Sequence, residues 1–172
     1  MNILVLNGSP RPDGNTAAMI AAFARGAKKM KHQVTVINVC EKQIAGCLGC
    51  EHCHTAGHGI CRQKDDMQEV YTALESADML VLASPIYYFG LTGQLQCAIH
   101  RMYAVGKPKR LQKSMLILSS GSNNVYDGAV YEYRKSFPEY MHLQDMGIFT
   151  AYGAKNKSEE IVSQLERAGS CV

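Results

Sequence analysis

Short apolar runs alternate along this chain with segments long enough to be helices, and this rhythm constrains the fold more than any other feature. The runs are continuous rather than alternating with polar residues, as expected of strands that are buried on both faces. They occupy residues 3–6, 34–37, 79–83, 114–118 and 147–151. This strand–helix repeat predicts an α/β fold, with a parallel sheet covered by helices on both faces.

Between the runs, apolar residues recur at intervals of three and four, which is the spacing of one helix face. We expect helices around residues 19–27, 67–74, 95–102, 126–135 and 159–167. No internal repeat or linker breaks the pattern. The sequence therefore predicts a single domain over residues 1–172, with a cysteine-rich insert at about residues 40–63.

The formal charge is only +3, and the lysines and arginines are scattered along the chain. This distribution argues against nucleic acid as a partner. The first residues, MNILVLNGSPRP, lack a basic region, and Gly8 and Pro10 end their apolar run too soon for a signal peptide or a membrane span. We therefore expect a cytoplasmic protein that has no membrane partner.

The stretch CLGCEHCHTAGHGIC, residues 47–61, holds four of the seven cysteines and three histidines. A protein that stays in the cytoplasm keeps its thiols reduced, and an odd number of cysteines also argues against a framework of disulfides. Soft thiolates suit zinc, iron–sulfur clusters and redox pairs alike. The stretch by itself therefore leaves the choice among these open.

In a parallel α/β sheet, ligands bind beyond the carboxyl ends of the strands, so the loops at that edge are the places to search for a site. The loop after the first run reads NGSPRPDGNT, residues 7–16. Hydroxyls, backbone N–H groups, a helix N-terminus and a guanidinium can together surround a phosphate. An ordinary turn with a helix cap would use the same residue types. The loop matches neither GxGxxG nor GxxxxGK[ST], so loops for dinucleotides and triphosphates are not supported.

The loops after the third and fourth runs also have unusual compositions. Residues 84–95 read SPIYYFGLTGQL, which offers a flat apolar wall and free backbone amides to a planar heterocycle. A core or oligomer contact would explain the same aromatic residues. Residues 119–124 read SSGSNN and could place small polar groups over the same crevice.

Taken together and in this order, the three loops resemble those of the flavodoxin-like family of NAD(P)H-dependent FMN reductases, quinone reductases and iron-sulfur flavoproteins. The most specific pieces are GSPR followed by GNT at residues 8–16, the cysteine block closing on Asp65-Asp66-Met67, and residues 84–95. The resemblance implies a flavodoxin-like five-stranded sheet in the order 2-1-3-4-5, with FMN bound at its carboxyl edge.

The resemblance also implies which residues contact the flavin. The FMN phosphate is expected to be held by Ser9, Arg11, Asn15 and Thr16, and Gly14 of the same loop is expected to contact the cofactor as well. The isoalloxazine ring is expected to be bordered by Pro85, Ile86, Tyr87, Tyr88, Phe89 and Gly90, and on its other side by Ser120 and Gly121. Because the flavin itself takes up the electrons, no side chain needs to act as an acid or base, and no catalytic residue is predicted.

For function, the resemblance implies an oxidoreductase that passes electrons from NAD(P)H, or from reduced ferredoxin, to a quinone, a flavin or another small acceptor. A non-enzymatic electron carrier or redox sensor is the alternative. Members of this family suggest a homodimer or homotetramer. A phosphoacceptor receiver is excluded because it needs an acidic pair after the first strand, where this chain has Asn7-Gly8-Ser9.

The cysteine spacing is Cys47-x2-Cys50-x2-Cys53-x7-Cys61, and its first part is the compact CxxCxxC run by which ferredoxins bind a 4Fe-4S cluster. The resemblance to iron-sulfur flavoproteins predicts such a cluster on these four cysteines, beside the flavin end of the sheet. Zinc is the alternative, with His52, His54 or His58 replacing one cysteine. Cysteines that hold no metal are a third reading.

Overall fold

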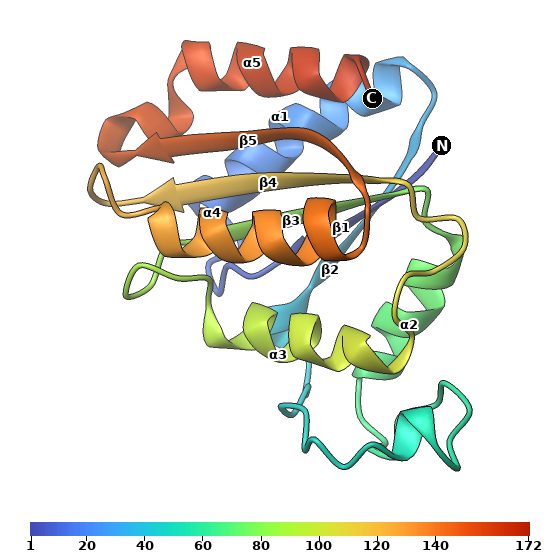
Figure 1. Ribbon diagram of the computed structural model, residues 1–172. Helices are drawn as coiled ribbons and strands as arrows, with labels where there is room; N and C mark the ends of the chain where they lie inside the picture. The colour runs from blue at the N-terminus through green and yellow to red at the C-terminus, as the bar shows by residue number, and fades with distance from the viewer.

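A five-stranded parallel sheet in the order β2-β1-β3-β4-β5 forms the centre of the computed structural model, which describes residues 1–172 (Figure 1). The strands are β1 Asn2–Asn7, β2 Gln33–Asn38, β3 Met79–Pro85, β4 Lys113–Ser120 and β5 Gln144–Tyr152. Every expected run lies inside one of these strands. The predicted fold class and the flavodoxin-like strand order are therefore confirmed.

Each of the expected helices is also present. The helices are α1 Asn15–Lys29, α2 Met67–Ser76, α3 Gly93–Arg101, α4 Asp127–Arg134 and α5 Glu159–Ser170. A π-helical segment, Lys135–Tyr140, continues α4. No helix combines the length and the apolar character that crossing a membrane would require.

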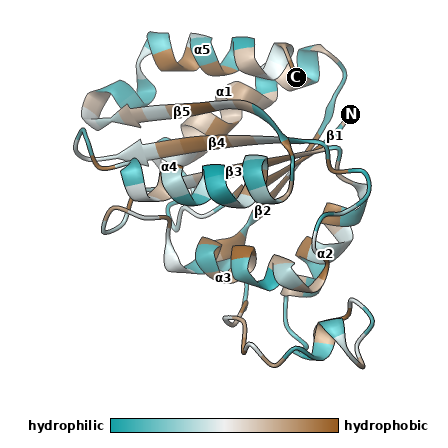
Figure 2. Ribbon diagram, in the orientation of Figure 1, coloured by the Kyte–Doolittle hydropathy of each residue, from teal (hydrophilic) through white to brown (hydrophobic).

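Helices cover both faces of the sheet and enclose two separate apolar cores. Helices α1 and α5 pack on one face, where Phe23 and Leu165 are fully buried, and α2, α3 and α4 pack on the other, where Leu74 and Leu95 are fully buried. Figure 2 shows the apolar residues gathered on the central strands and polar residues along the outer sides of the helices. Burial of these apolar side chains is the main force that holds the layers together.

Helices α1 and α5 approach each other closely because glycine stands at the two points of contact. A Cβ added to Gly26 would collide with the backbone oxygen of Glu166, and one added to Gly169 would collide with the backbone oxygen of Phe23. Beside this contact, Arg25 Nε donates to Glu166 Oε1 over 2.6 Å. The position of α1 on the sheet is therefore set by backbone contact with α5.

The edge strands differ from the expectation that all five runs would be buried on both faces. In β2 the side chain of Val36 is 43% exposed, and most of β5 is only half-buried. An edge strand has a neighbour on one side only, and the helices of this fold are centred over β1, β3 and β4. The expectation of full burial was therefore wrong for β2 and β5, because a continuous apolar run does not distinguish an edge strand from a central one.

Candidate functional site

A hollow of about 200 Å³ lies at the carboxyl edge of the sheet, where the loops after β1, β3 and β4 meet. We call it the strand-end hollow. Its lining residues are Ser9, Arg11, Gly14, Asn15, Thr16, Pro85, Ile86, Tyr87, Ser119, Ser120, Gly121 and Gly153. All five predicted cofactor contacts of the first loop are among them, as are five of the eight predicted ring contacts. The structure does not bring Tyr88, Phe89 or Gly90 to this lining.

Hydrogen bonds fold the loop between β1 and α1 tightly around Ser9. The hydroxyl of Ser9 accepts a bond from the backbone N–H of Arg11 over 3.2 Å, and the backbone N–H of Ser9 donates to Asn7 Oδ1 over 3.0 Å. The loop closes where the backbone N–H of Gly14 donates to the carbonyl of Arg11 over 3.1 Å. These bonds leave the Arg11 side chain exposed at the rim of the hollow.

The N-terminus of α1 points into this loop without a side-chain cap, and its first turn holds no acidic residue. In contrast, α5 is capped by Ser158, which accepts from the N–H of Ile161, and carries two glutamates in its first turn. The first N–H groups of a helix have no partner inside the helix and carry partial positive charge. The start of α1 is therefore suited to an anion such as a phosphate.

A buried pair of hydroxyls joins the phosphate loop to β4. Thr16 Oγ1 lies 2.8 Å from Ser119 Oγ, and both residues are buried. A hydroxyl can donate one hydrogen bond and accept two, so Thr16 can keep this bond while its hydroxyl or its backbone N–H contacts a ligand. Ser119 was not among the predicted contacts, although it belongs to the loop that the sequence pointed to.

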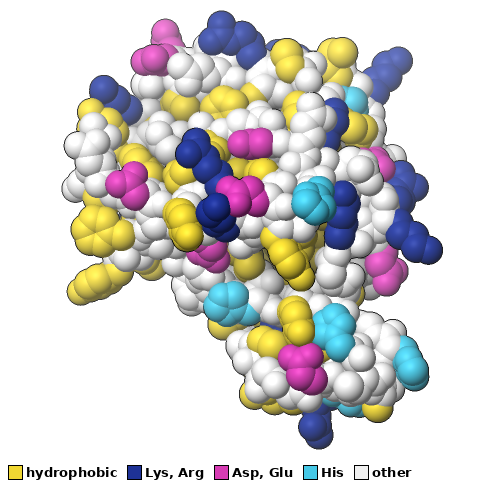
Figure 3. Space-filling view, viewed as in Figure 1, with side chains coloured by type: hydrophobic (Ala, Val, Ile, Leu, Met, Phe, Trp, Pro, Cys, Tyr) yellow, Lys and Arg dark blue, Asp and Glu magenta, His cyan; other side chains and the backbone are white.

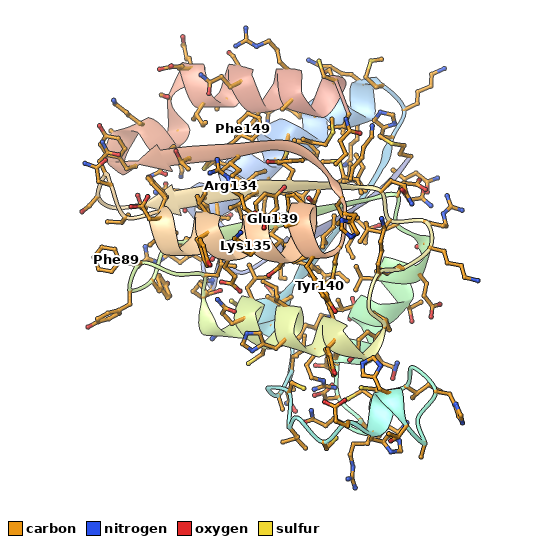
Figure 4. All side chains as sticks on the ribbon, viewed as in Figure 1. Phe89, Arg134, Lys135, Glu139, Tyr140 and Phe149 are labelled. Atoms are coloured by element: carbon orange, nitrogen blue, oxygen red, sulfur yellow. The ribbon has the colours of Figure 1, made fainter.

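The loop after β3 forms a tight hairpin with two aromatic residues at its tip. The backbones of Tyr87 and Gly90 exchange two hydrogen bonds of 3.0 Å, and between them Tyr88 and Phe89 have positive φ angles of 47° and 65°. Two central residues with positive φ make a type I′ turn, which normally takes Asn and Gly. Tyr88 is fully exposed, and Figure 4 shows Phe89 at the tip, pointing away from the body of the protein.

Replacing the tip by Asn-Gly, as Tyr88→Asn with Phe89→Gly, is expected to raise the free energy of unfolding by about 1 to 2 kcal/mol. The left-handed conformation costs a residue other than glycine about 1 to 2 kcal/mol, which the replacement removes. Part of this stabilisation is lost because glycine gives the unfolded chain more conformational freedom. Urea unfolding measures the change. The pair Tyr88→Ala and Phe89→Ala is the control, because it removes the same rings without relieving the backbone. If both double variants have the same stability, the turn is not strained.

The other wall of the hollow is held by residues that the sequence did not single out. Asn156 is buried, and its Nδ2 donates to the carbonyls of Ser120 and Gly153 over 2.8 Å each. The hydroxyl of Tyr126 pairs with Ser120 Oγ over 2.7 Å and donates to the carbonyl of Ala151 over 2.9 Å. Tyr126 does not line the hollow, so this wall consists of small residues.

The cysteine insert, residues 42–66, leaves β2 at the carboxyl edge and forms a lobe below α3, at the bottom of the views in Figure 1 and Figure 3. All four predicted cysteines, Cys47, Cys50, Cys53 and Cys61, line one small cavity, together with Arg101, Tyr103 and Ala104. We call it the cysteine cavity. It lies at the C-terminal end of α3, whereas the strand-end hollow lies near the start of that helix. The expectation that the cysteines lie beside the flavin end of the sheet was therefore wrong.

None of the histidines of the insert lines the cysteine cavity. The Nε2 atom of His54 is 2.9 Å from the backbone carbonyl of Tyr103, and the two rings meet edge to face at 4.4 Å. His58 lies in a separate groove, next to α2. No three His, Cys, Asp or Glu side chains of this structure are grouped so that they could hold a metal ion. Desolvation is the main cause that raises the pKa of the Cys53 thiol above its ordinary value.

A comparison with known protein families matches residues 1–156 to the model described as NADPH-dependent FMN reductase. The chain is 34% identical over 128 residues to an iron-sulfur flavoprotein of Archaeoglobus fulgidus, a match that covers 74% of this chain and 56% of that protein. It is 24% identical over 146 residues to an iron-sulfur flavoprotein of Methanosarcina thermophila, covering 85% and 75% of the two chains. Over its first relatives, the chain spans about half of their length.

Solved structures with the same arrangement include an NAD(P)H:quinone oxidoreductase from Methanothermobacter marburgensis, with a TM-score of 0.76 and 14% identity over 99% of this chain and 94% of that one. An FMN-dependent NADH-azoreductase from Bacillus anthracis, solved in complex with FMN, gives a TM-score of 0.72 and 16% identity over 99% and 98% of the chains. At this level of identity, the likeness shows the fold.

Proposed function

The chain belongs to the NADPH-dependent FMN reductase family, and on this premise we propose that it is an oxidoreductase that uses bound FMN to pass electrons from NAD(P)H to a quinone, a flavin or another small acceptor. The observation that carries the proposal is the strand-end hollow. Loops far apart in the sequence meet there around one uncapped helix N-terminus, with an arginine at the rim and an apolar wall opposite.

The residues present fit FMN. Ser9, Arg11 and the N-terminus of α1 supply donors for a phosphate dianion, and Gly14 allows the loop to turn back on itself, because a Cβ there would lie 3.0 Å from that of Arg11. Pro85 and Ile86 offer an apolar surface for a ring. When bound, FMN supplies the redox chemistry, since it accepts a hydride or single electrons. The chain holds and orients it, and backbone amides stabilise negative charge on its polar edge.

The small residues of the β4–α4 loop support a reductase over a pure carrier. A nicotinamide must stack on a flavin at about 3 to 3.5 Å for hydride transfer, which requires one open face. Ser119, Ser120 and Gly121 place no large side chain on this wall of the hollow, and Tyr126 is tied to the loop by its hydroxyl. The donor therefore has room to approach.

Rapid anaerobic mixing of the FMN-loaded protein with NADH or NADPH is expected to bleach the flavin absorbance at least about tenfold faster than either donor bleaches free FMN, because the site orients the two reactants. Reduced ferredoxin is the matched comparison. If neither nicotinamide exceeds the free-flavin rate while ferredoxin reduces the flavin readily, the reductase proposal fails, and a ferredoxin-dependent enzyme or an electron carrier takes its place.

We further propose that Cys47, Cys50, Cys53 and Cys61 hold a 4Fe-4S cluster. No three of these thiols are grouped as metal ligands in this structure, so binding would draw them together. Two observations support the proposal: the four thiols line one cavity, and their spacing begins with the compact CxxCxxC run of ferredoxins. Zinc has less support, because none of the histidines that could replace a cysteine lines the cysteine cavity. The proteins similar to this chain that are named iron-sulfur flavoproteins point the same way.

The carrier alternative gains some support from the position of the insert. Cys47 and Cys50 are exposed, which gives a redox protein access to them. The cysteine cavity lies at one end of α3, and the loop that precedes α3 lies at the other. The nine residues of this helix span about 13 Å at the rise of an α-helix. A cytoplasmic location, a single domain and a homodimeric or homotetrameric assembly remain predictions from the sequence.

A further inference from the structure

At the end of α3, Arg101 is buried with only 1% of its side chain exposed. Arginine is among the residues least often fully buried, because its charge loses hydration there unless it is paired and hydrogen-bonded. Arg101 does not line the strand-end hollow, but it lines the cysteine cavity. Its burial therefore calls for an explanation at the cysteine insert.

Two nitrogens of Arg101 close the neck of the insert. Nη1 donates to the backbone carbonyl of Ala45 over 3.0 Å and to Asp65 Oδ2 over 2.7 Å, and Nη2 donates to Asp65 Oδ1 over 3.1 Å. Ala45 and Asp65 stand on opposite sides of the four cysteines in the sequence. Asp65 also accepts from the N–H groups of Ala45 and Met67, each over 3.2 Å. One guanidinium thus ties both ends of the cysteine-bearing loop to α3.

The charges of this pair are stable at neutral pH. Burial alone would raise the pKa of Asp65, but the hydrogen bonds from Arg101 and from the two backbone amides outweigh it and hold the pKa below its usual value. The backbone carbonyl of Arg101 is itself fixed, since it accepts from the hydroxyl of Tyr71 over 2.8 Å. The guanidinium is consequently held in one orientation.

The third nitrogen of Arg101 has no partner. Its Nε–H is buried and makes no hydrogen bond, whereas Nη1 and Nη2 both donate to groups of the neck. A buried charged donor without an acceptor costs free energy. The unpaired Nε–H therefore points to an acceptor that a bound ligand supplies. Arg101 lines the cavity that the four thiols also line, and the four thiolates of a bound cluster make that site anionic.

We propose that Arg101 is a positioning residue of the cysteine site: Nη1 and Nη2 fix the neck of the insert, and Nε–H donates a hydrogen bond to a sulfur of the anionic ligand set. This inference rests on the proposed 4Fe-4S cluster. Hydrogen bonds to the sulfurs are among the factors that set the reduction potential of a cluster. Arg101 therefore stabilises the more negatively charged reduced form, as well as the loop that carries the ligands.

The test uses the full chain, reconstituted anaerobically with iron and sulfide, and measures iron per chain, FMN per chain and the cluster midpoint potential by spectroelectrochemical titration. Arg101→Lys keeps the positive charge but loses the Nε–H. It is expected to bind FMN like the unmodified chain, to lose iron more readily, and to show a cluster midpoint potential shifted to lower values. Arg134→Lys is the matched control, because Arg134 is an exposed arginine that lines neither cavity, and the change should leave the potential unaltered.

Asp65→Asn separates the two roles. It loosens the neck but keeps Nε–H, so it should lower iron retention without shifting the potential of the cluster that remains. If Arg101→Lys does not fold, the double change Arg101→Met with Asp65→Leu replaces the buried pair by apolar side chains and restores a folded neck without the donor. A variant that lacks Nε–H but has the unmodified potential and iron content overturns the inference. An unmodified chain that takes up no iron overturns both this inference and the cluster on which it rests.

Discussion

Replacing Arg11 by alanine is expected to weaken FMN binding by about 10- to 100-fold, because one charge-assisted hydrogen bond to the phosphate is worth about 1.5 to 3 kcal/mol. Riboflavin, which has the same ring system but no phosphate, is expected to lose little affinity. Arg11 lines the hollow together with Gly14 and Asn15, which form the uncapped N-terminus of α1. Titration calorimetry or flavin fluorescence quenching with the apoprotein gives both dissociation constants.

Arg134→Ala is the matched control for this change. Arg134 is an exposed arginine on α4 that lies outside the strand-end hollow (Figure 4), so its loss should leave both ligands unaffected. An equal loss of affinity for FMN and riboflavin in Arg11→Ala would show that the phosphate binds elsewhere. If the unmodified chain binds no flavin at all, the assignment of the three loops to a flavin site is wrong.

Replacing Cys53 by serine is expected to remove most of the iron from the anaerobically reconstituted chain. The unmodified chain is expected to hold about four iron atoms, as in a four-thiolate 4Fe-4S site. The side chain removed lines the cysteine cavity with the other three thiols. FMN should stay bound, because the cavity shares no lining residue with the strand-end hollow. Iron, sulfide and flavin assays on the same sample, with the absorption spectrum, measure both cofactors together.

Cys97→Ser provides the control, since Cys97 is a partly buried cysteine of α3 that lines neither cavity. It should change neither the iron nor the flavin content. Stoichiometric binding of zinc, with no uptake of iron by the unmodified chain, would decide for a zinc site. Full iron content in Cys53→Ser would show that this thiol is not a ligand.

The strands and the loops of the hollow were predictable because local sequence determines them. The continuous apolar run at residues 79–83 predicts a strand, and it forms β3, which is buried along nearly its whole length. The loop that contains Ser9 and Arg11 follows the first strand, and parallel strands bring such loops to one edge by topology alone. Fold and phosphate loop thus follow from pattern and connectivity.

The parts that could not be predicted depend on contacts between distant segments. Gly153 lines the hollow because β5 ends beside β4, and Asn156 reaches back to the carbonyl of Ser120; neither residue belongs to a recognisable motif. Tyr88 and Phe89 were expected at the ring, but their positive φ angles turn them to the tip of a hairpin. The position of the cysteines below α3 depends on the contacts that Arg101 and Tyr103 make with the insert. The cysteine spacing alone does not reveal these contacts.

The backbone contact between α1 and α5 makes the position of the phosphate loop depend on the last helix, although α5 contributes no residue to the lining of the hollow. Any side chain at Gly26 or Gly169 would push α1 away from α5, and the phosphate loop would move with the start of α1. A substitution at Gly26 or Gly169 is therefore expected to alter flavin binding, although it changes no residue that lines the hollow.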